Sequence, residues 1–323
     1  MKQICAVLAA AVVLLAGCVA SPVSTPTPTS TAVSVTPSSV ASTGSTADSS
    51  TSTRAPLTSF SGTLEGDTPT NNGTGFALTA QQIDQLDALI AGYDGRIAVG
   101  YCDIESGYRY VFGAAETFKA ASIMKAPFCR YVLGVIEQQD TIRLTDTMVY
   151  TETYYTEGTG VIKDAEFGTV YTLEELIKLA IRRSDNIAFK MLRTVFPPSG
   201  FRQFAADIGI RDTAGIQNVA NSNISAEDAI TYMLDIAAYI GGGTDGGEAL
   251  KEHMLNTRYP LITSPYPVIR KHGWMDGAYH DIAIIDAPHP YVLVILTNRD
   301  QGTNEDKALF REIAAAVDAV AQK

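Results

Sequence analysis

The chain carries a serine and a lysine three residues apart in the stretch KAASIMKAPF, residues 119–128. On a helix, residues i and i+3 lie on one face, so Ser122 and Lys125 would point the same way and place an amine beside a hydroxyl. A serine becomes a nucleophile when a base removes its proton, and a lysine is such a base when burial or neighbouring cations lower its pKa. A helix start with Ser122 as N-cap and Lys125 on a solvated surface fits the same letters.

Two further segments distinguish these interpretations. In TLEELIKLAIRRSDNIAFKML, Thr172 and Glu175 form a capping box, and the predicted helix ends near Arg183 at the turn-forming residues 184–186, Ser-Asp-Asn. Lys-His-Gly-Trp at 271–274 lies on a late predicted strand, where the glycine allows close approach of a ligand's backbone. Each segment alone is also explained by an ordinary turn or strand edge.

The ordered set S-x-x-K, S-D-N and K-x-G resembles the motifs of the penicillin-recognising serine enzymes, and of class A β-lactamases most closely. The resemblance covers nearly all of residues 76–323. It implies an α/β, β-lactamase/transpeptidase-like fold with a five-stranded antiparallel sheet flanked by helices, plus an all-helical subdomain. It also implies a serine hydrolase that cleaves an amide through an acyl-enzyme.

Catalytic roles follow from the resemblance. Ser122 is expected to be the nucleophile and Lys125 its base, with Lys271 nearby to lower the pKa of Lys125. Ser184 would relay a proton between Lys271 and the leaving nitrogen. Lys271 would also raise the positive potential that attracts a substrate carboxylate, so that a protein of net negative charge still binds an anion.

Substrate-binding roles follow in the same way. Asn186 is expected to hold the substrate's amide carbonyl, and the backbone N–H groups of Ser122 and Trp274 to form the oxyanion hole, beside Gly273. Pro127 fits the first turn of a helix that begins at Ser122, with that turn free or locally distorted.

Tyr154 or Tyr155 is a candidate aromatic wall of the site by resemblance, and we chose Tyr155. The segment YTETYYTEG, residues 150–158, fits equally well a surface loop whose tyrosines cover the core.

Two departures from the class A pattern affect the prediction. His272 occupies the place of the usual threonine or serine hydroxyl that helps to bind a carboxylate, and it either donates a hydrogen bond instead or faces away. No glutamate lies between Asn186 and Ser225, although class A enzymes use one there to activate the deacylating water. Asp212 is the only acidic substitute we considered, because Glu227 fits dipole compensation at a helix start. Acylation is therefore expected to outpace deacylation.

Hydrophobic periodicity predicts the elements that position these residues. Thr79 and Gln82 form a capping box before one amphipathic helix, and residues 307–320 form another. Five strands are predicted, two early and three late, over 96–104, 107–113, 267–275, 280–287 and 291–298. Both ends of the domain should thus complete one sheet.

The N-terminus predicts export. Residues 1–17 have a basic start and a short apolar core, as in a signal peptide, and the run Leu-Ala-Gly before Cys18 resembles the lipobox of bacterial lipoproteins. An ordinary secretory peptide that contains Cys18 is the alternative. Residues 18–75 are rich in Ser, Thr and Pro and predict a disordered tether to the domain at 76–323. We expect a lipoprotein anchored through Cys18 and facing the cell wall.

Composition limits the partners. The net charge of −11 argues against nucleic acid, and neither the histidines nor the cysteines have the spacing of metal ligands. We expect a monomer without cofactor or metal. Cys102 and Cys129 fit either a disulfide or, preferably, two buried thiols.

The expected substrate is a β-lactam or a small peptidoglycan-derived molecule. The alternatives are a penicillin-binding-type D-Ala-D-Ala carboxypeptidase or related cell-wall hydrolase, and a catalytically quiet wall-binding lipoprotein.

Overall fold

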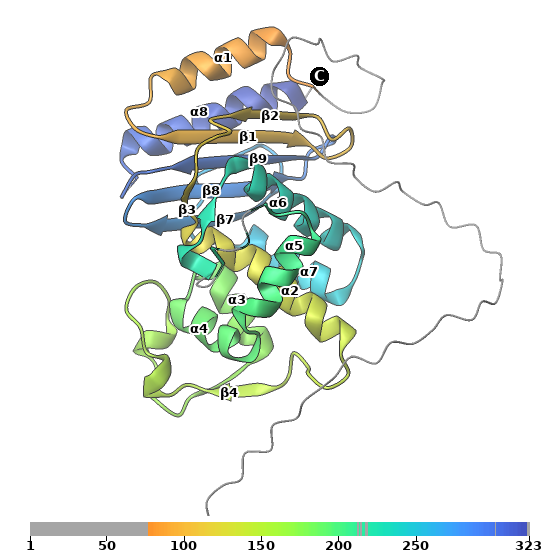
Figure 1. Ribbon diagram of the computed structural model, residues 1–323, viewed down its shortest axis with the longest axis vertical. Helices are drawn as coiled ribbons and strands as arrows, with labels where there is room; N and C mark the ends of the chain where they lie inside the picture. Colours follow the sequence, from red (N-terminus) through yellow and green to blue (C-terminus); the bar gives the residue numbers. More distant parts are fainter. Residues whose placement is uncertain (1–76, 212, 214, 217–218, 301, 322–323) are drawn as a thin grey trace, which may run out of the picture. The chain divides into compact units, whose positions relative to one another are not determined.

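A computed structural model describes residues 77–211, 213, 215–216, 219–300 and 302–321. Its main sheet has five antiparallel strands in the order β2-β1-β9-β8-β7, so that the early and late strands form one sheet, as predicted (Figure 1). The strands of this sheet are β1 Ile97–Asp103, β2 Arg109–Phe112, β7 Val268–Met275, β8 Ala278–Ile285 and β9 Tyr291–Thr297. The short pairs β3 Phe118–Lys119 with β6 Asn223–Ile224 and β4 Thr147–Val149 with β5 Val170–Thr172 lie outside it.

Helices cover both faces of the main sheet (Figure 1). The helices are α1 Ala80–Ala91, α2 Lys125–Gln138, α3 Leu173–Arg182, α4 Asn186–Val195, α5 Pro198–Asp207, α6 Ala226–Gly241, α7 Asp245–Leu255 and α8 Asn304–Ala321. Both predicted capping boxes are present, at Thr79 before α1 and at Thr172 before α3. The last helix begins at Asn304, slightly earlier than its apolar periodicity indicated.

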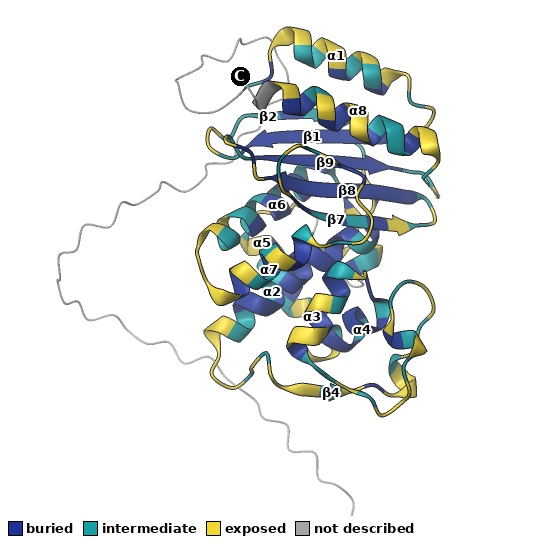
Figure 2. Cartoon of the chain, turned by 180° about the vertical axis from the view of Figure 1, so that it is seen from behind, coloured by how far each residue is buried: buried dark blue, intermediate teal, exposed yellow. Residues whose placement is uncertain are grey.

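Side chains of the central strands alternate between two apolar cores, as the period of a strand requires. In β1, Val99 and Tyr101 belong to the core under α1 and α8, whereas Ala98 and Cys102 belong to the core shared with the remaining helices. Figure 2 shows these strands buried along their length between the two layers. The sheet flanked by helices and the separate helical part confirm the predicted fold class.

The segment that carries the S-x-x-K motif is locally distorted. A 3-10 turn, Ala121–Met124, precedes α2 and packs against β7. Ala121 has φ +52°, in the left-handed region that a side chain disfavours. The distorted first turn expected beside Pro127 is therefore present, with Ser122 in it.

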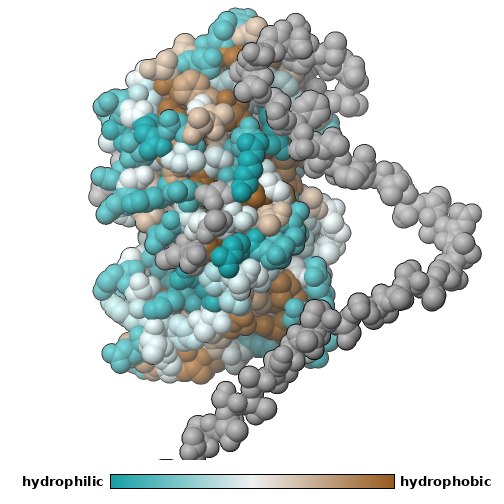
Figure 3. Space-filling view, viewed as in Figure 1, coloured by the Kyte–Doolittle hydropathy of each residue, from teal (hydrophilic) through white to brown (hydrophobic). Residues whose placement is uncertain are grey.

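The predicted signal peptide, Cys18, the tether and Asp212 lie outside the described residues. Within the described part of the chain, none of the helices is both long and apolar enough to cross a membrane. On the face drawn in Figure 3, hydrophilic residues are spread among smaller hydrophobic areas. Cys102 and Cys129 are buried free thiols, the preferred of the two predictions.

Candidate active site

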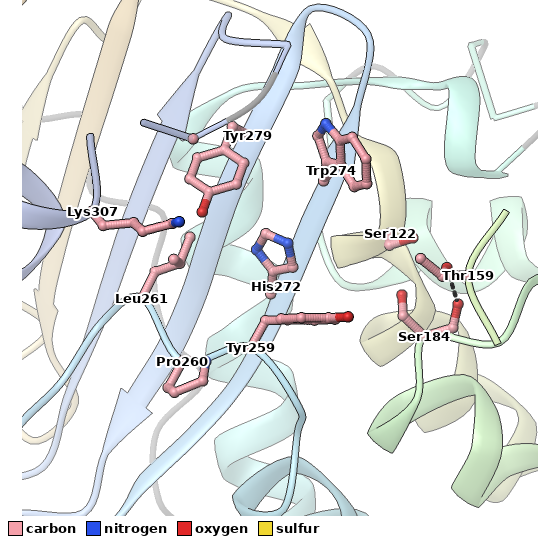
Figure 4. A pocket seen from close by; sticks show the side chains of 11 residues that line it. Ser122, Thr159, Ser184, Tyr259, Pro260, Leu261, His272, Trp274, Tyr279 and Lys307 are labelled. Atoms are coloured by element: carbon pink, nitrogen blue, oxygen red, sulfur yellow. Dashed lines mark hydrogen bonds between the residues drawn. The ribbon is translucent and has the colours of Figure 1, made fainter. Parts of the chain in front are cut away.

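A pocket of about 340 Å³ lies where β7 meets the 3-10 turn and the start of α4 (Figure 4). Its walls come from parts of the chain that are distant in sequence. The lining residues are Ser122, Thr159, Ser184, Tyr259, Pro260, Leu261, His272, Trp274, Tyr279, Gly302 and Lys307. Four residues selected from the sequence are thus at the pocket: Ser122, Ser184, His272 and Trp274.

Ser122 is partly exposed at the pocket. The 3-10 turn has no side-chain cap, which excludes the N-cap interpretation of this serine. Its hydroxyl makes no hydrogen bond to any other described residue, so it is free to approach a ligand.

Lys125 lies beneath the pocket and is only 1% exposed, which excludes the surface interpretation. Its Nζ donates to Asn186 Oδ1 at 2.7 Å and to the backbone carbonyl of Ser184. Burial, together with the positive charge of Lys271, lowers the pKa of Lys125 well below its ordinary value, and Asp185 opposes this in part. A lower pKa favours the neutral amine, which is the form of lysine that acts as a base.

Lys271 is the second buried amine and is 2% exposed. Its Nζ donates to Ser184 Oγ at 3.1 Å and to the backbone carbonyl of His272 at 2.6 Å. Burial lowers its pKa to about 8, with Asp281 opposing the shift, so this amine still carries its charge at neutral pH.

Ser184 connects the two amines, because its Oγ also lies 3.3 Å from Lys125 Nζ. Lys271 carries its charge at neutral pH and donates to Ser184 Oγ. The Ser184 hydroxyl is then able to donate its proton to the lone pair of Lys125 when that amine is neutral. Ser184 has φ +53°, a left-handed conformation that places its hydroxyl between the lysines. The three groups form a path along which a proton can move.

The sequence analysis gave no role to Asp185, whose buried side chain holds the turn at Ser184 in place through backbone hydrogen bonds. Its Oδ1 caps α4 by accepting from Ile187 N and Ala188 N, each at 2.9 Å. Its Oδ2 accepts from Val161 N at 2.6 Å and Ile162 N at 3.0 Å. One buried carboxylate thus ties residues 161–162 to the turn that carries Ser184.

Thr159 precedes residues 161–162 and was also missed. Its hydroxyl donates to the Ser184 carbonyl at 2.8 Å, drawn as a dashed line in Figure 4, and its own carbonyl accepts from Asn186 N at 3.0 Å. A threonine in a turn-rich loop gives no sequence signal for this contact, because the partner is 25 residues away.

Asp281 plays the corresponding role on the opposite wall. It is fully buried on β8 and its Oδ2 accepts from Leu261 N at 3.1 Å and Ile262 N at 3.0 Å. The loop that carries Tyr259 and Pro260 is thereby fixed to the sheet.

Gly273 brings β7 against the nucleophile. A Cβ at this position would lie 2.8 Å from Ile123 N and 3.2 Å from Ser122 N, too close for any side chain. The sequence predicted that Gly273 allows a ligand's backbone to approach closely, but in the structure the backbone that approaches Gly273 is the chain's own 3-10 turn. The contact holds the Trp274 backbone on the edge strand beside Ser122.

Asn186 and Tyr155 are not among the residues that line the pocket. The side chain of Asn186 is occupied by Lys125 and by the Glu157 carbonyl, to which its Nδ2 donates at 3.3 Å. Tyr155 is 42% exposed and its hydroxyl donates to Glu157, whereas Tyr154 packs against the core. The aromatic residues that line the pocket are instead Tyr259, Trp274 and Tyr279. They lie outside the tyrosine-rich segment 150–158.

Among the described residues, none that lines the pocket carries a carboxylate. Glu227 is at the start of α6 and pairs with Arg211 at 3.4 Å and Arg109 at 3.9 Å, which agrees with its helix-start interpretation. The described residues also contain no cluster of acidic, histidine or cysteine side chains that could hold a metal ion.

Comparisons with known proteins agree with this geometry. The model of the beta-lactamase enzyme family matches residues 81–320. A beta-lactamase of Amycolatopsis lactamdurans is 25% identical over 248 residues, which are 67% of this chain and 77% of that protein.

Solved structures share the fold. A beta-lactamase from Chitinophaga pinensis aligns with a TM-score of 0.66 at 16% identity, over 75% of this chain and 99% of the other. A variant of PBP-A, solved as an acyl-enzyme complex with penicillin G, aligns with a TM-score of 0.65 at 18% identity, over 75% of this chain and 96% of the other.

Proposed function

Because the chain belongs to the beta-lactamase enzyme family, we propose that it opens β-lactam rings through an acyl-enzyme on Ser122 and releases the product slowly. The observation that carries this proposal is the buried path from Lys125 through Ser184 to Lys271. Such a path moves a proton away from a nucleophile and returns it to a leaving group.

Acylation proceeds in two proton steps. Neutral Lys125 takes the proton of Ser122 as Oγ attacks the lactam carbonyl, and the backbone N–H groups of Ser122 and Trp274 stabilise the oxyanion. The C–N bond then breaks, and the proton reaches the leaving nitrogen through Ser184, beside the ammonium of Lys271. The lactam ring is opened, and its carbonyl carbon is esterified to Ser122.

Deacylation requires a second base to activate water, and the described residues of the pocket supply no carboxylate for this step. Lys125 and Lys271 are left for it, and both are engaged with Ser184. The ester on Ser122 therefore accumulates. This distinguishes the proposed enzyme from an efficient class A β-lactamase.

Whole-protein mass spectrometry after incubation with benzylpenicillin tests the proposal. We expect the mass to increase by one penicilloyl group that maps to the Ser122 peptide, and Ser122→Ala to remain unmodified. An unmodified wild-type protein would contradict the proposal and favour a quiet wall-binding protein.

A penicillin-binding-type D-Ala-D-Ala carboxypeptidase is the second candidate. The pocket without a carboxylate and the likeness to PBP-A, a variant of which is acylated by penicillin G in its solved structure, favour it. Release of D-alanine from a D-Ala-D-Ala peptide by the wild-type protein, but not by Ser122→Ala, would select this function.

We also propose that the protein is exported, anchored by a lipid on Cys18, and held near the cell wall by residues 18–75 as a tether. The lipobox-like sequence before Cys18 supports this. Cys18→Ser should move the protein from the membrane to the soluble fraction. An unchanged membrane fraction would contradict the anchor.

A further inference from the structure

His272 lies between Tyr259 and Tyr279 on the pocket wall, so it faces the site rather than away from it (Figure 4). Its Nδ1 is 3.0 Å from the backbone carbonyl of His280 on β8. A carbonyl oxygen only accepts, so Nδ1 carries the proton and donates to it.

The other ring nitrogen is therefore an acceptor. Burial, followed by the charge of Lys271, lowers the pKa of His272 to about 3, so the ring is neutral at neutral pH. In Figure 4, the ring nitrogen away from β8 is on the side of Ser122. This part of the pocket thus presents a lone pair, which attracts an N–H or O–H group of a ligand and repels a carboxylate.

The opposite end of the pocket presents donors instead. Lys307 reaches it from the start of α8 and makes no ion pair with any described residue. The nearby carboxylate of Asp306 is turned to other partners, the Thr303 N–H at 2.7 Å and Arg299 at 3.5 Å. A cation near the N-terminus of a helix is unfavourable for the helix itself, so the position of Lys307 is not explained by helix stability.

Tyr279 stands next to this lysine and is 7% exposed. Its hydroxyl has no hydrogen-bond partner among the described residues, although its ring lines the pocket. Gly302 makes room for it, because a Cβ there would overlap the ring. A hydroxyl at the pocket without a partner among the described residues and a lysine without a described counter-ion together suit a bound anion.

We propose that Lys307 and Tyr279 form an anion subsite for a substrate carboxylate, and that His272 accepts a hydrogen bond from an N–H or O–H group of the same substrate. His272 lies between this subsite and Ser122. The inference deepens the proposed function and rests on it. The favoured acyl donor carries an amide N–H close to the scissile carbonyl and its carboxylate further out, as a peptide does. A penicillin has its carboxylate directly on the fused ring, and that carboxylate would meet the His272 lone pair.

Three derivatives of benzylpenicillin separate the two features, with the ring carboxylate converted to a methyl ester, a methylamide or a glycine amide. At the position of the ring carboxylate, the ester has neither N–H nor charge, the methylamide adds an N–H, and the glycine amide adds a distal carboxylate. Binding is measured by calorimetry on Ser122→Ala, so that the result does not depend on acylation.

We expect the methylamide to bind several-fold tighter than the ester, and the glycine amide roughly tenfold tighter than the methylamide. In the Ser122→Ala background, Lys307→Met should remove the second advantage only, and His272→Phe the first only. Lys251→Met, a lysine paired with Asp286 outside the pocket, should change neither.

Equal binding of glycine amide and methylamide, or an advantage that survives Lys307→Met, would overturn the anion subsite. Equal binding of methylamide and ester would overturn the role of His272, and no binding of any derivative would overturn both. Failure of the wild-type protein to acylate, with these differences intact, would instead contradict the proposed function alone.

Discussion

The pocket has two unlike parts, one around Ser184 and one between Trp274 and Lys307. Around Ser184, two buried lysines share one hydroxyl, and among the described residues the only non-glycine residues with left-handed backbone are Ala121 and Ser184. The other part is lined by tyrosines, a tryptophan and a neutral imidazole. The contacts of the first part suit proton transfer, and the lining of the second part suits ligand binding.

The difference between the two parts bears on which of the two proposed steps, acylation or deacylation of Ser122, the described residues support. Buried amines and strained backbone cost free energy, and they concentrate at sites where chemistry needs them. In the described part of the chain, the buried lysines and the left-handed non-glycine residues are Lys125, Lys271, Ala121 and Ser184, which belong to or adjoin the groups that the proposal uses for acylation. Among the described residues that line the pocket, none carries a carboxylate that could activate water.

Loss of the base should give the largest effect. Lys125→Ala should lower the acylation rate roughly 10²–10⁴-fold, because the proton of Ser122 then has no acceptor. Stopped-flow measurement with a chromogenic cephalosporin checks this, with thermal unfolding as the control for folding. An unchanged rate would mean that Lys125 has only a structural role. The part of the pocket around Ser184 would then not differ from the other part in serving proton transfer.

The charge of Lys271 should give a pH-dependent effect. Its pKa is lowered to about 8, so the acylation rate should be level near neutral pH and fall roughly tenfold per unit well above pH 8, as the ammonium is lost. A rate that continues to rise through that range would show that the charge of Lys271 is not used.

Unfolding does not explain such a fall. Between pH 8 and the ordinary value of 10.5, the unfolded chain binds more protons at this lysine than the folded protein does. The contribution of Lys271 to the free energy of unfolding therefore increases with pH in that window. Circular dichroism at each pH provides the control.

The strain beside Ser122 should give the smallest effect. Ala121→Gly removes a methyl group but relieves a left-handed conformation, and these changes should nearly cancel, within about 1 kcal/mol. Ala126→Gly makes the same change in the buried first turn of α2 and should cost about 2 kcal/mol. Urea unfolding of both variants measures the difference, and equal losses would mean that Ala121 stores no strain.

The sequence was sufficient for the fold, and it selected residues that the structure brings together around Ser184. Capping boxes, strand alternation and the ordered motifs are local signals, and they located Ser122, Lys125, Ser184 and Lys271. In the structure, Lys125 and Lys271 both contact Ser184, and the catalytic roles of these residues stay predictions.

The second part of the pocket could not be predicted in the same way. Lys307 reaches the site from the last helix without any motif, and the tautomer of His272 depends on a carbonyl of the neighbouring strand. Asp185 and Thr159 act through backbone groups, which the sequence does not display. Tyr155 was expected from the resemblance, whereas the aromatic residues that line the pocket come from other segments.

The burst of a chromogenic cephalosporin tests the central claim most directly. Rapid mixing of a known amount of wild-type protein with excess substrate should release close to one equivalent of product per Ser122, followed by a slow steady rate. Ser122→Ala should give neither phase. Rapid multiple turnover without a burst would contradict the account, because some group, with Asp212 as the first candidate, would then supply the base that the pocket lacks.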